Sequence, residues 1–292
     1  MENFKNWMVG LDLTLVDETI LAYTQYLAEI FKPEKIHFVH IANLDALPDE
    51  EPAKEAIKAE METLVGGYFK NYPGTMCEVY DGKPFFELWR ESYLHNTDLF
   101  IVGSKHPENG RGIMPKKFVR KSFCSVLFIP EETKPNIDKI LVPTDFSEYS
   151  SVALQSAIEI SARVNSRVLV HHVIDLPQSY GDQSRQEVID TMMKQAEEEY
   201  KQFIRQFPPS HLSIEPLFGV REYSYVAEHI KNEAEIKKVN LIIMSAGGKS
   251  RLSILFLGSE TEKILQMEKE IPVMILKQKV KDVKLWDILT SI

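Results

Sequence analysis

Two short segments near the C-terminus have the residue types and the spacing of a phosphate-binding loop. Ser245-Ala246-Gly247-Gly248 follows an apolar run, and after nine further residues Gly258-Ser259 opens an amphipathic pattern. Glycine lets the backbone approach a ligand closely, and the first N–H groups of a helix can hold an anion without a basic side chain. Ser259 and Glu262 also form an ordinary capping box, and a glycine pair is often only a turn. The segments therefore indicate an anion site and leave the purely structural interpretation open.

A carboxylate further upstream occupies a position where a nucleotide could use it. Residues 139–145 are a short apolar run that ends in Pro143-Thr144-Asp145, and an amphipathic helix follows Ser147, with Asn165 as its expected end. A carboxylate repels a triphosphate but accepts hydrogen bonds from ribose hydroxyls or a base amine. Asp145 is therefore expected at the end of the ligand opposite to the phosphates.

Apolar runs and helical periodicities alternate along the second half of the chain. Strands are expected at 139–145, 168–175, 212–218, 241–244 and 272–276, with helices between them, one of which spans about 223–236. Such alternation predicts a doubly wound parallel sheet with right-handed crossovers. In the expected strand order 3-2-1-4-5, ligands bind beyond the carboxyl end of the first strand. The loop that holds Asp145 and the segment 245–259 flank that crevice, whereas a flavodoxin-like order is the alternative.

The first half repeats the same plan. Its apolar runs at 7–12, 36–41, 98–103 and 125–129 match those of the second half, and residues 130–136 have the composition of a surface linker. The fold class is therefore α/β, with two tandem doubly wound domains of five parallel strands each. The expected domains are residues 1–132 and 137–277, followed by an apolar tail, residues 278–292, that packs on this chain or on a second copy.

Composition narrows the classes of partner. The 292 residues are 44% apolar, and a net charge of −9 argues against nucleic acid, which needs a basic surface. There is no run long enough to span a membrane and no secretory signal pattern, so the expected location is the cytoplasm. Cys77 and Cys124 lack the CxxC spacing of a metal site, and the adjacent His171 and His172 point to opposite faces of a strand, which disfavours chelation of one ion.

These motifs together resemble the universal stress protein (UspA-like) family. Val142 to Asp145 match the Val-Pro-Thr-Asp end of that family's first strand, and His172 to Asp175 match the end of its second strand. The ATP-binding members are similar to Gly-x2-Gly-x9-Gly-Ser/Thr, whose spacing is reproduced from Ser245 through Gly248 to Gly258-Ser259. The resemblance covers nearly the whole chain as a tandem pair.

The resemblance implies a site for ATP or another adenine nucleotide, with Mg²⁺ as an accompanying ion left open. It implies that Asp145 binds the adenine or ribose side and that the phosphates lie at Gly248, Gly258 and Ser259. The full set of expected site residues is Pro143, Thr144, Asp145, Val173, Met244, Ser245, Gly248, Gly258, Ser259 and Glu260. No catalytic residue and no metal ligand can be assigned from the sequence.

Two substitutions depart from the family pattern within this set. Ser245 replaces the first glycine, and Glu260 places negative charge close to a bound triphosphate. In the first half, the loop after Gly103 is five residues shorter than its counterpart and contains Pro107. Asp12 is retained there, but the glycine spacing is lost, so the first domain is expected to carry a degenerate site.

Three functions remain open on the sequence alone. The first is a stress-response protein that binds ATP as a regulatory ligand, with at most slow hydrolysis. The second is a nucleotide-free interaction protein, and the third is a slow ATPase or nucleotidyl transferase.

The two halves are expected to pair within one chain through their last strands, near Val126 to Ile129 and Val273 to Leu276. A homodimer and an unidentified protein partner are left open.

Overall fold

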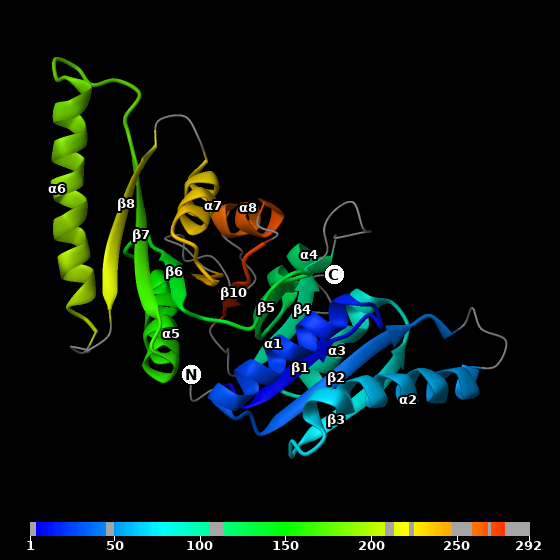
Figure 1. Ribbon diagram of the computed structural model, residues 1–292. Coiled ribbons are helices and arrows are strands. Elements are labelled where there is room, and N and C mark those ends of the chain that lie inside the picture. Colours follow the sequence, from blue (N-terminus) through cyan, green and yellow to red (C-terminus); the bar gives the residue numbers. More distant parts are fainter. Residues whose placement is uncertain are drawn as a thin grey trace.

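The computed structural model describes residues 4–44, 50–104, 114–207, 213–221, 225–246, 259–267 and 270–277 (Figure 1). The expected phosphate-binding residues Gly248 and Gly258 lie outside the described residues, as does the expected packing tail at 278–292. The expected loop after Gly103 falls largely outside them too.

Strands and helices alternate in the first half, as the apolar runs predict. Its elements are β1 (Asn6–Gly10), α1 (Val16–Phe31), β2 (Lys35–Ala42), α2 (Glu50–Phe69), β3 (Thr75–Asp81), α3 (Pro84–Leu94), β4 (Leu99–Ser104), α4 (Met114–Lys121) and β5 (Ser125–Pro130).

The second half follows the same sequence of elements. They are β6 (Lys139–Pro143), α5 (Glu148–Val164), β7 (Arg167–Asp175), α6 (Arg185–Ile204), β8 (Ile214–Arg221), α7 (Val226–Ile236), β9 (Leu241–Ser245), α8 (Ser259–Met267) and β10 (Val273–Leu276). Strand β8 runs three residues beyond the predicted end at Phe218, and α7 begins later than predicted, after its N-cap residue Tyr225. Asn165 ends α5 in the left-handed conformation, with φ of 56°, which confirms the predicted stop.

All ten strands form one sheet in the order β3-β2-β1-β4-β5-β10-β9-β6-β7-β8. Read inward from each outer edge, each half has the order 3-2-1-4-5, and the pairs within each half are parallel. The predicted order is therefore confirmed. In the second half the chain runs from β6 to β7 and β8 on one side and returns to β9 and β10 on the other, so the switch point lies at β6 and β9.

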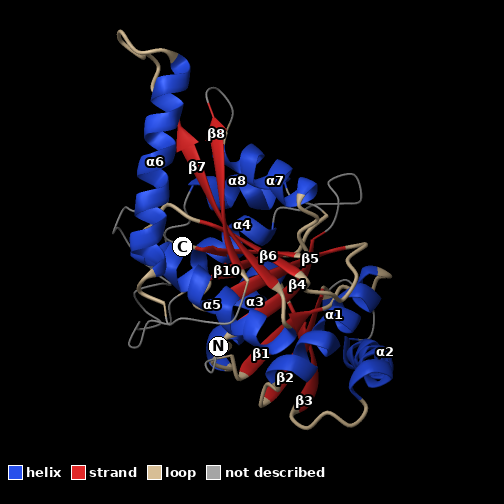
Figure 2. Cartoon of the chain, turned by 60° about the vertical axis from the view of Figure 1, so that its left-hand side comes forward, coloured by secondary structure: helices blue, strands red, loops and turns tan. Residues whose placement is uncertain are grey.

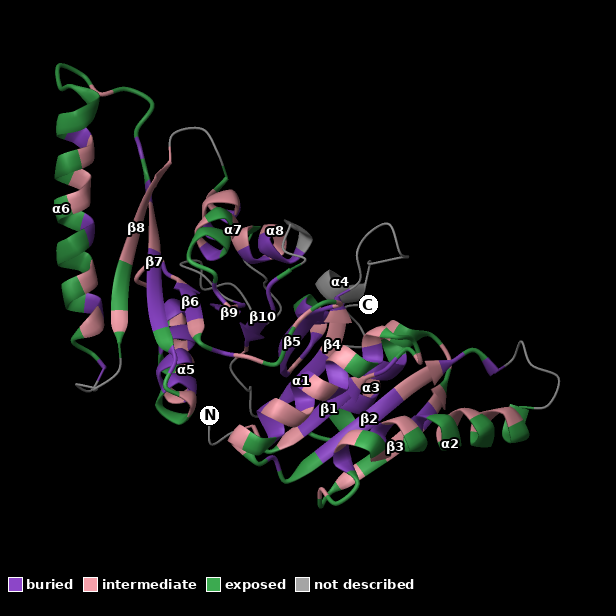
Figure 3. Cartoon of the chain, in the orientation of Figure 1, coloured by how far each residue is buried: buried purple, intermediate pink, exposed green. Residues whose placement is uncertain are grey.

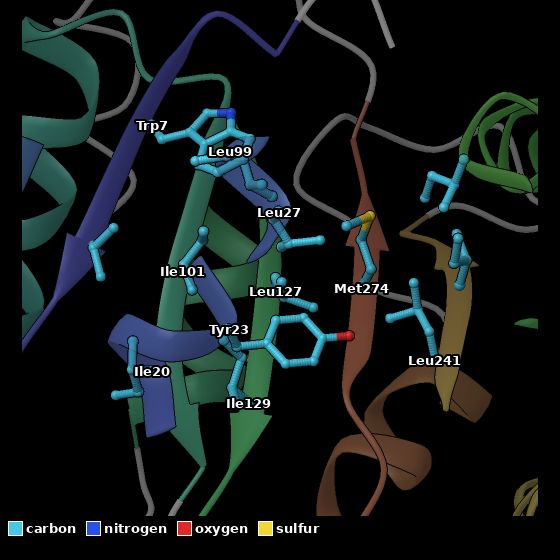
Figure 4. Close-up of a cluster of buried hydrophobic side chains, with 14 of the residues drawn as sticks. Trp7, Ile20, Tyr23, Leu27, Leu99, Ile101, Leu127, Ile129, Leu241 and Met274 are labelled. Carbon is cyan, nitrogen blue, oxygen red and sulfur yellow. The ribbon is translucent and has the colours of Figure 1, made fainter. Parts of the chain in front are cut away.

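The two halves join through an antiparallel pair of buried strands. Met274 of β10 lies opposite Leu127 of β5, with Val273 opposite Phe128 and Ile275 opposite Val126. This pairing within the chain was predicted and is confirmed. Figure 4 shows the result: side chains from both halves, including Tyr23, Leu127 and Met274, meet in one cluster beside the joined strands.

Helices cover both faces of the sheet (Figure 2). One apolar cluster packs α1, α2, α5 and α6 against one face, and a second cluster packs α3, α4, α7 and α8 against the other. Figure 3 shows buried strands between helices whose outer surfaces are exposed. None of the helices in the described part of the chain has the length and apolar character that crossing a membrane requires.

Candidate functional site

Strands β6 and β9 separate before they end. Their ladder pairs only Ile140 with Leu241 and Leu141 with Ile242, although β6 continues to Pro143. The corresponding strands of the first half, β1 and β4, stay paired to the last residue of β1, Gly10. Proline has no N–H to donate to a ladder, which favours separation at Pro143. The second half therefore has an opening at its topological switch point, where doubly wound sheets bind ligands.

A cavity of about 260 Å³ occupies this opening. It lies beyond the carboxyl ends of β6, β7 and β9 and reaches α7 and α8. Its lining residues are Pro143, Thr144, Asp145, Ser150, His171, His172, Val173, Val226, Ile230, Met244, Ser245, Glu260 and Thr261.

The turn after β6 is held by its own hydroxyl groups. The Thr144 hydroxyl donates to Ser150 Oγ at 2.9 Å and accepts from the backbone N–H of Phe146 at 2.9 Å. Phe146 has φ of 59°, an uncommon conformation for a bulky residue, so these bonds fix a strained turn. The Asp145 carboxylate accepts from the backbone N–H of Ser147 at 3.1 Å and from its hydroxyl at 2.5 Å. Asp145 is thus held at the cavity with oxygen lone pairs left for further donors.

His172 fastens this turn to the next strand. Its Nδ1 lies 2.9 Å from the Thr144 carbonyl oxygen, and its ring stacks on Phe146 with centroids 4.4 Å apart. The carbonyl oxygen can only accept, so Nδ1 carries the proton and His172 is a donor here. The first half has the same bond, because His40 Nδ1 lies 2.9 Å from the Leu11 carbonyl oxygen.

The opposite wall comes from the first turn of α8. Glu260 accepts from the backbone N–H of Ala227 at 2.9 Å and from Lys263 Nζ at 2.8 Å. The Thr261 hydroxyl donates to the Ser245 carbonyl oxygen at 3.4 Å. These contacts tie α8 to α7 and β9 around the cavity, and Glu260 contributes negative charge to its wall.

His171 is the buried polar residue of the strand wall. It is 1% exposed, and neither ring nitrogen has a hydrogen-bond partner among the described residues. Burial, followed by the neighbouring His229 and His172, lowers the pKa of His171 to about 4. The imidazole is therefore neutral at pH 7.

In the first half, side chains of α1 contact the turn after β1 and strand β4. Asp17 is 1% exposed, and its carboxylate accepts from the backbone N–H groups of Asp12 at 3.2 Å, Leu13 at 2.6 Å and Thr14 at 3.3 Å. A Cβ at Gly103 would come within 2.9 Å of Ile20 Cδ1, so α1 packs directly on β4. Both contacts are consistent with the degenerate site expected for this half.

The structure brings most of the predicted site residues together. Pro143, Thr144, Asp145, Val173, Met244, Ser245 and Glu260 line the cavity, whereas Ser259 begins α8 outside the lining, and Gly248 and Gly258 are not described. Sequence reasoning weighed His171 and His172 only as metal ligands and disfavoured that role, and it missed Ser150, Val226, Ile230 and Thr261. The apolar spacing of α7 predicted a helix but not which of its residues face the cavity.

Comparisons with known proteins agree with this geometry. The universal stress protein family model matches residues 136–277. Universal stress protein MJ0531 of Methanocaldococcus jannaschii is 29% identical over 149 residues, which are 49% of this chain and 84% of that protein. Universal stress protein MJ0577 of the same organism is 29% identical over 157 residues, which are 48% of this chain and 95% of that protein.

Solved structures share the fold of the whole chain. A universal stress protein from Archaeoglobus fulgidus is 18% identical and superposes with a TM-score of 0.64, covering 94% of this chain and 98% of its own. That similarity extends the likeness in fold to both halves. Through residues 136–277 the chain belongs to the universal stress protein family.

Proposed function

We propose that this chain is a cytoplasmic stress-response protein that binds ATP, or another adenine nucleotide, in the cavity of its second half as a regulatory ligand. The domains that carry this function are residues 1–132, with a degenerate site, and residues 137–277, with the binding site. The proposal extends the family membership to a specific ligand and a specific place in the chain.

The observation that carries the proposal is the cavity at the separation of β6 and β9. Seven of the residues that the family resemblance implies for a nucleotide line it, and they come from three strand ends and from α8. Its volume of about 260 Å³ is slightly below the range of about 300–1,000 Å³ that is usual for whole drug-sized ligands. A base and a sugar suit that volume, and the phosphates would extend toward the N-terminus of α8 at Ser259.

The charges support the same orientation. Asp145 offers carboxylate oxygens to ribose hydroxyls, whereas the N-terminus of α8 favours an anion. Glu260 opposes a triphosphate at that end, so we expect modest affinity. With modest affinity, the fraction of the protein that carries nucleotide changes with the nucleotide concentration, as a regulatory ligand requires.

Isothermal titration of the full chain with ATP tests the proposal. We expect saturable binding at one site, and Asp145→Ala is expected to weaken it at least tenfold. Asp12→Ala, the equivalent change in the first half, is the matched control and is expected to leave affinity unchanged. Absence of binding at millimolar ATP, or equal losses in the two variants, contradicts the proposal. Absence of binding favours a nucleotide-free interaction protein instead.

A further inference from the structure

Helix α3 carries aromatic side chains on a face that is partly open to solvent. Phe86, Trp89 and Tyr93 recur at helical spacing and, with Phe123 just before β5, form what we call the aromatic face. The ring centroid of Trp89 is 6.3 Å from that of Phe86 and 5.8 Å from that of Phe123, and Tyr93 is 5.6 Å from Phe123. Trp89 is buried, but Phe86 and Tyr93 are 38% and 36% exposed. Partly exposed rings that lie together are typical of a surface that binds another segment.

The corresponding positions of the second half are charged. Helices α3 and α7 both have 11 residues, and matching them from their first residues pairs the helical members of the aromatic face with Glu228, Lys231 and Glu235. Lys231 Nζ lies 3.4 Å from Glu235 Oε1, as expected of a helix surface in water. Matching the strand ladders β4–β5 and β9–β10 pairs Phe123 with Glu270. The fold therefore accepts charged residues at all four positions, and packing within the half does not explain the aromatic ones.

The chain leaves β10 beside the aromatic face. Because β10 is antiparallel to β5, it ends next to the start of β5, where the backbone N–H of Lys277 donates to Ser125 Oγ at 3.1 Å. The ammonium group of Lys277 donates to the carbonyl oxygens of Arg120 at 3.1 Å and Ser122 at 2.7 Å. Ser122 directly precedes Phe123 in the sequence. Residues 278–292, which follow Lys277, therefore start next to this surface.

The sequence of residues 278–292 contains an apolar pattern that fits such a surface. Four residues follow the i, i+3, i+4, i+7 spacing of one helix face: Leu285, Ile288, Leu289 and Ile292. Residues 278–284 precede this pattern and, when extended, span about 23 Å. The helical part of the aromatic face, from Phe86 to Tyr93, is about 10 Å long. The segment is therefore long enough to lie along it.

We propose that residues 285–292 dock as an amphipathic helix on the aromatic face of the same chain, with Lys277 fixing the start of the segment. Docking removes both the apolar stripe of the segment and the exposed rings of Phe86 and Tyr93 from water, which is favourable. The covalent connection makes the encounter intramolecular, which favours this occupant over a second copy of the chain. The proposal does not depend on the nucleotide site.

Cleavage by chymotrypsin after Trp286, followed by mass spectrometry, tests the proposal, because a docked helix must leave its surface before the protease can cut it. The test variant combines Tyr93→Glu with Phe123→Glu. Both changes copy the residues of the second half, Glu235 and Glu270, and circular dichroism checks that the variant folds. We expect cleavage about tenfold faster in this double variant than in the wild type.

Ile236→Glu is the matched control. Ile236 is 68% exposed at the end of α7, so the change places the same charge on an exposed apolar residue of the second half. This variant should be cleaved as slowly as the wild type. As a second measurement, hydrogen exchange of the backbone amides of residues 87–95 should be slower in the full chain than in a chain that stops at Lys277, because docking opposes local opening of α3.

Each outcome supports or overturns the proposal. Slow cleavage of a monomeric wild type and fast cleavage of the double variant support it. Equal cleavage rates in these two proteins overturn it, whether both rates are fast or both are slow. A wild type that sediments as a dimer, and that dissociates when the chain stops at Lys277, docks the segment on a second copy and also overturns it. If the double variant does not fold, the hydrogen exchange of α3 decides, and equal exchange in the full and shortened chains overturns the proposal.

Discussion

Met274 lies directly opposite Leu127 where β10 pairs with β5, and the two side chains are 1% and 0% exposed. This pairing joins the edge strand of one half to the edge strand of the other, so the apolar cluster on that face continues from one half into the other. Stability of either half should therefore depend on this junction.

Met274→Asp tests that dependence. A carboxylate at this buried position has no partner, so the free energy of unfolding should fall by more than about 3 kcal/mol. Urea denaturation followed by circular dichroism measures the loss. Leu15→Asp introduces the same charge at a side chain that is 89% exposed and is the N-cap of α1, where Asp is favoured, so it should not lower the free energy of unfolding. Equal effects of the two changes would contradict the importance of the junction.

Stability should rise with pH between about 4 and 6.5. Burial, together with His95 for His37 and with His229 and His172 for His171, lowers the pKa of each residue to about 4 from the ordinary 6.5. In this window the unfolded chain binds protons that the folded chain does not, so acid favours unfolding. Each histidine should remove about 1.5 kcal/mol between pH 6.5 and pH 5. Urea titrations at both pH values should show a smaller loss for the double variant His37→Val and His171→Val than for the wild type.

Ser147→Ala should weaken the turn beside the cavity. Ser147 is the N-cap of α5, where its hydroxyl accepts from the backbone N–H of Ser150 at 3.3 Å and also donates to Asp145. Loss of this cap should lower the free energy of unfolding by about 1 kcal/mol. Ser151→Ala, whose hydroxyl bonds only a carbonyl of its own helix, is the control and should change stability by less than about 0.5 kcal/mol. A loss of the same size in both variants would show that the cap is not the cause.

Glu260→Gln should strengthen ATP binding about fivefold, because a negative charge in the cavity wall is removed while an oxygen remains to accept from Ala227. Adenosine, which has no phosphates, should bind with unchanged affinity. Glu262→Gln, on the same turn of α8 but paired with Arg120, is the control and should leave ATP affinity unchanged. Titration calorimetry with both ligands checks this, and weaker ATP binding in Glu260→Gln would place the phosphates elsewhere.

The order of strands and the residues at their carboxyl ends could be predicted because they follow from local patterns. Apolar runs alternate with helical periodicity, and parallel strands bring their ends to one edge of the sheet. Asp145, Val173 and Met244 are distant in sequence but come together at the cavity for this reason. The pairing of β5 with β10 was also predictable, because both last strands are apolar and need a covered edge.

The contacts that distinguish the two sites could not be predicted, since each depends on what lies across the sheet. Asp12 is retained in the first half, but the sequence does not reveal that Asp17 accepts three backbone N–H groups beside it. The lack of partners around His171 is likewise set by neighbours on β8 and α7, including Gly219. Strand periodicity gives the face of a residue and not its hydrogen bonds.

The ladder between β5 and β10 has a consequence for assembly. Two separate chains that pair edge to edge dissociate on dilution. When a short linker connects the two strands, pairing becomes intramolecular, and the linker sets the effective concentration of one strand near the other. Here residues 131–138 connect β5, the last strand of the first half, to β6, the first strand of the second half. The association of this pair is therefore independent of how much of the protein the cell contains, and one half can lose its own ligand site without losing its place beside the other.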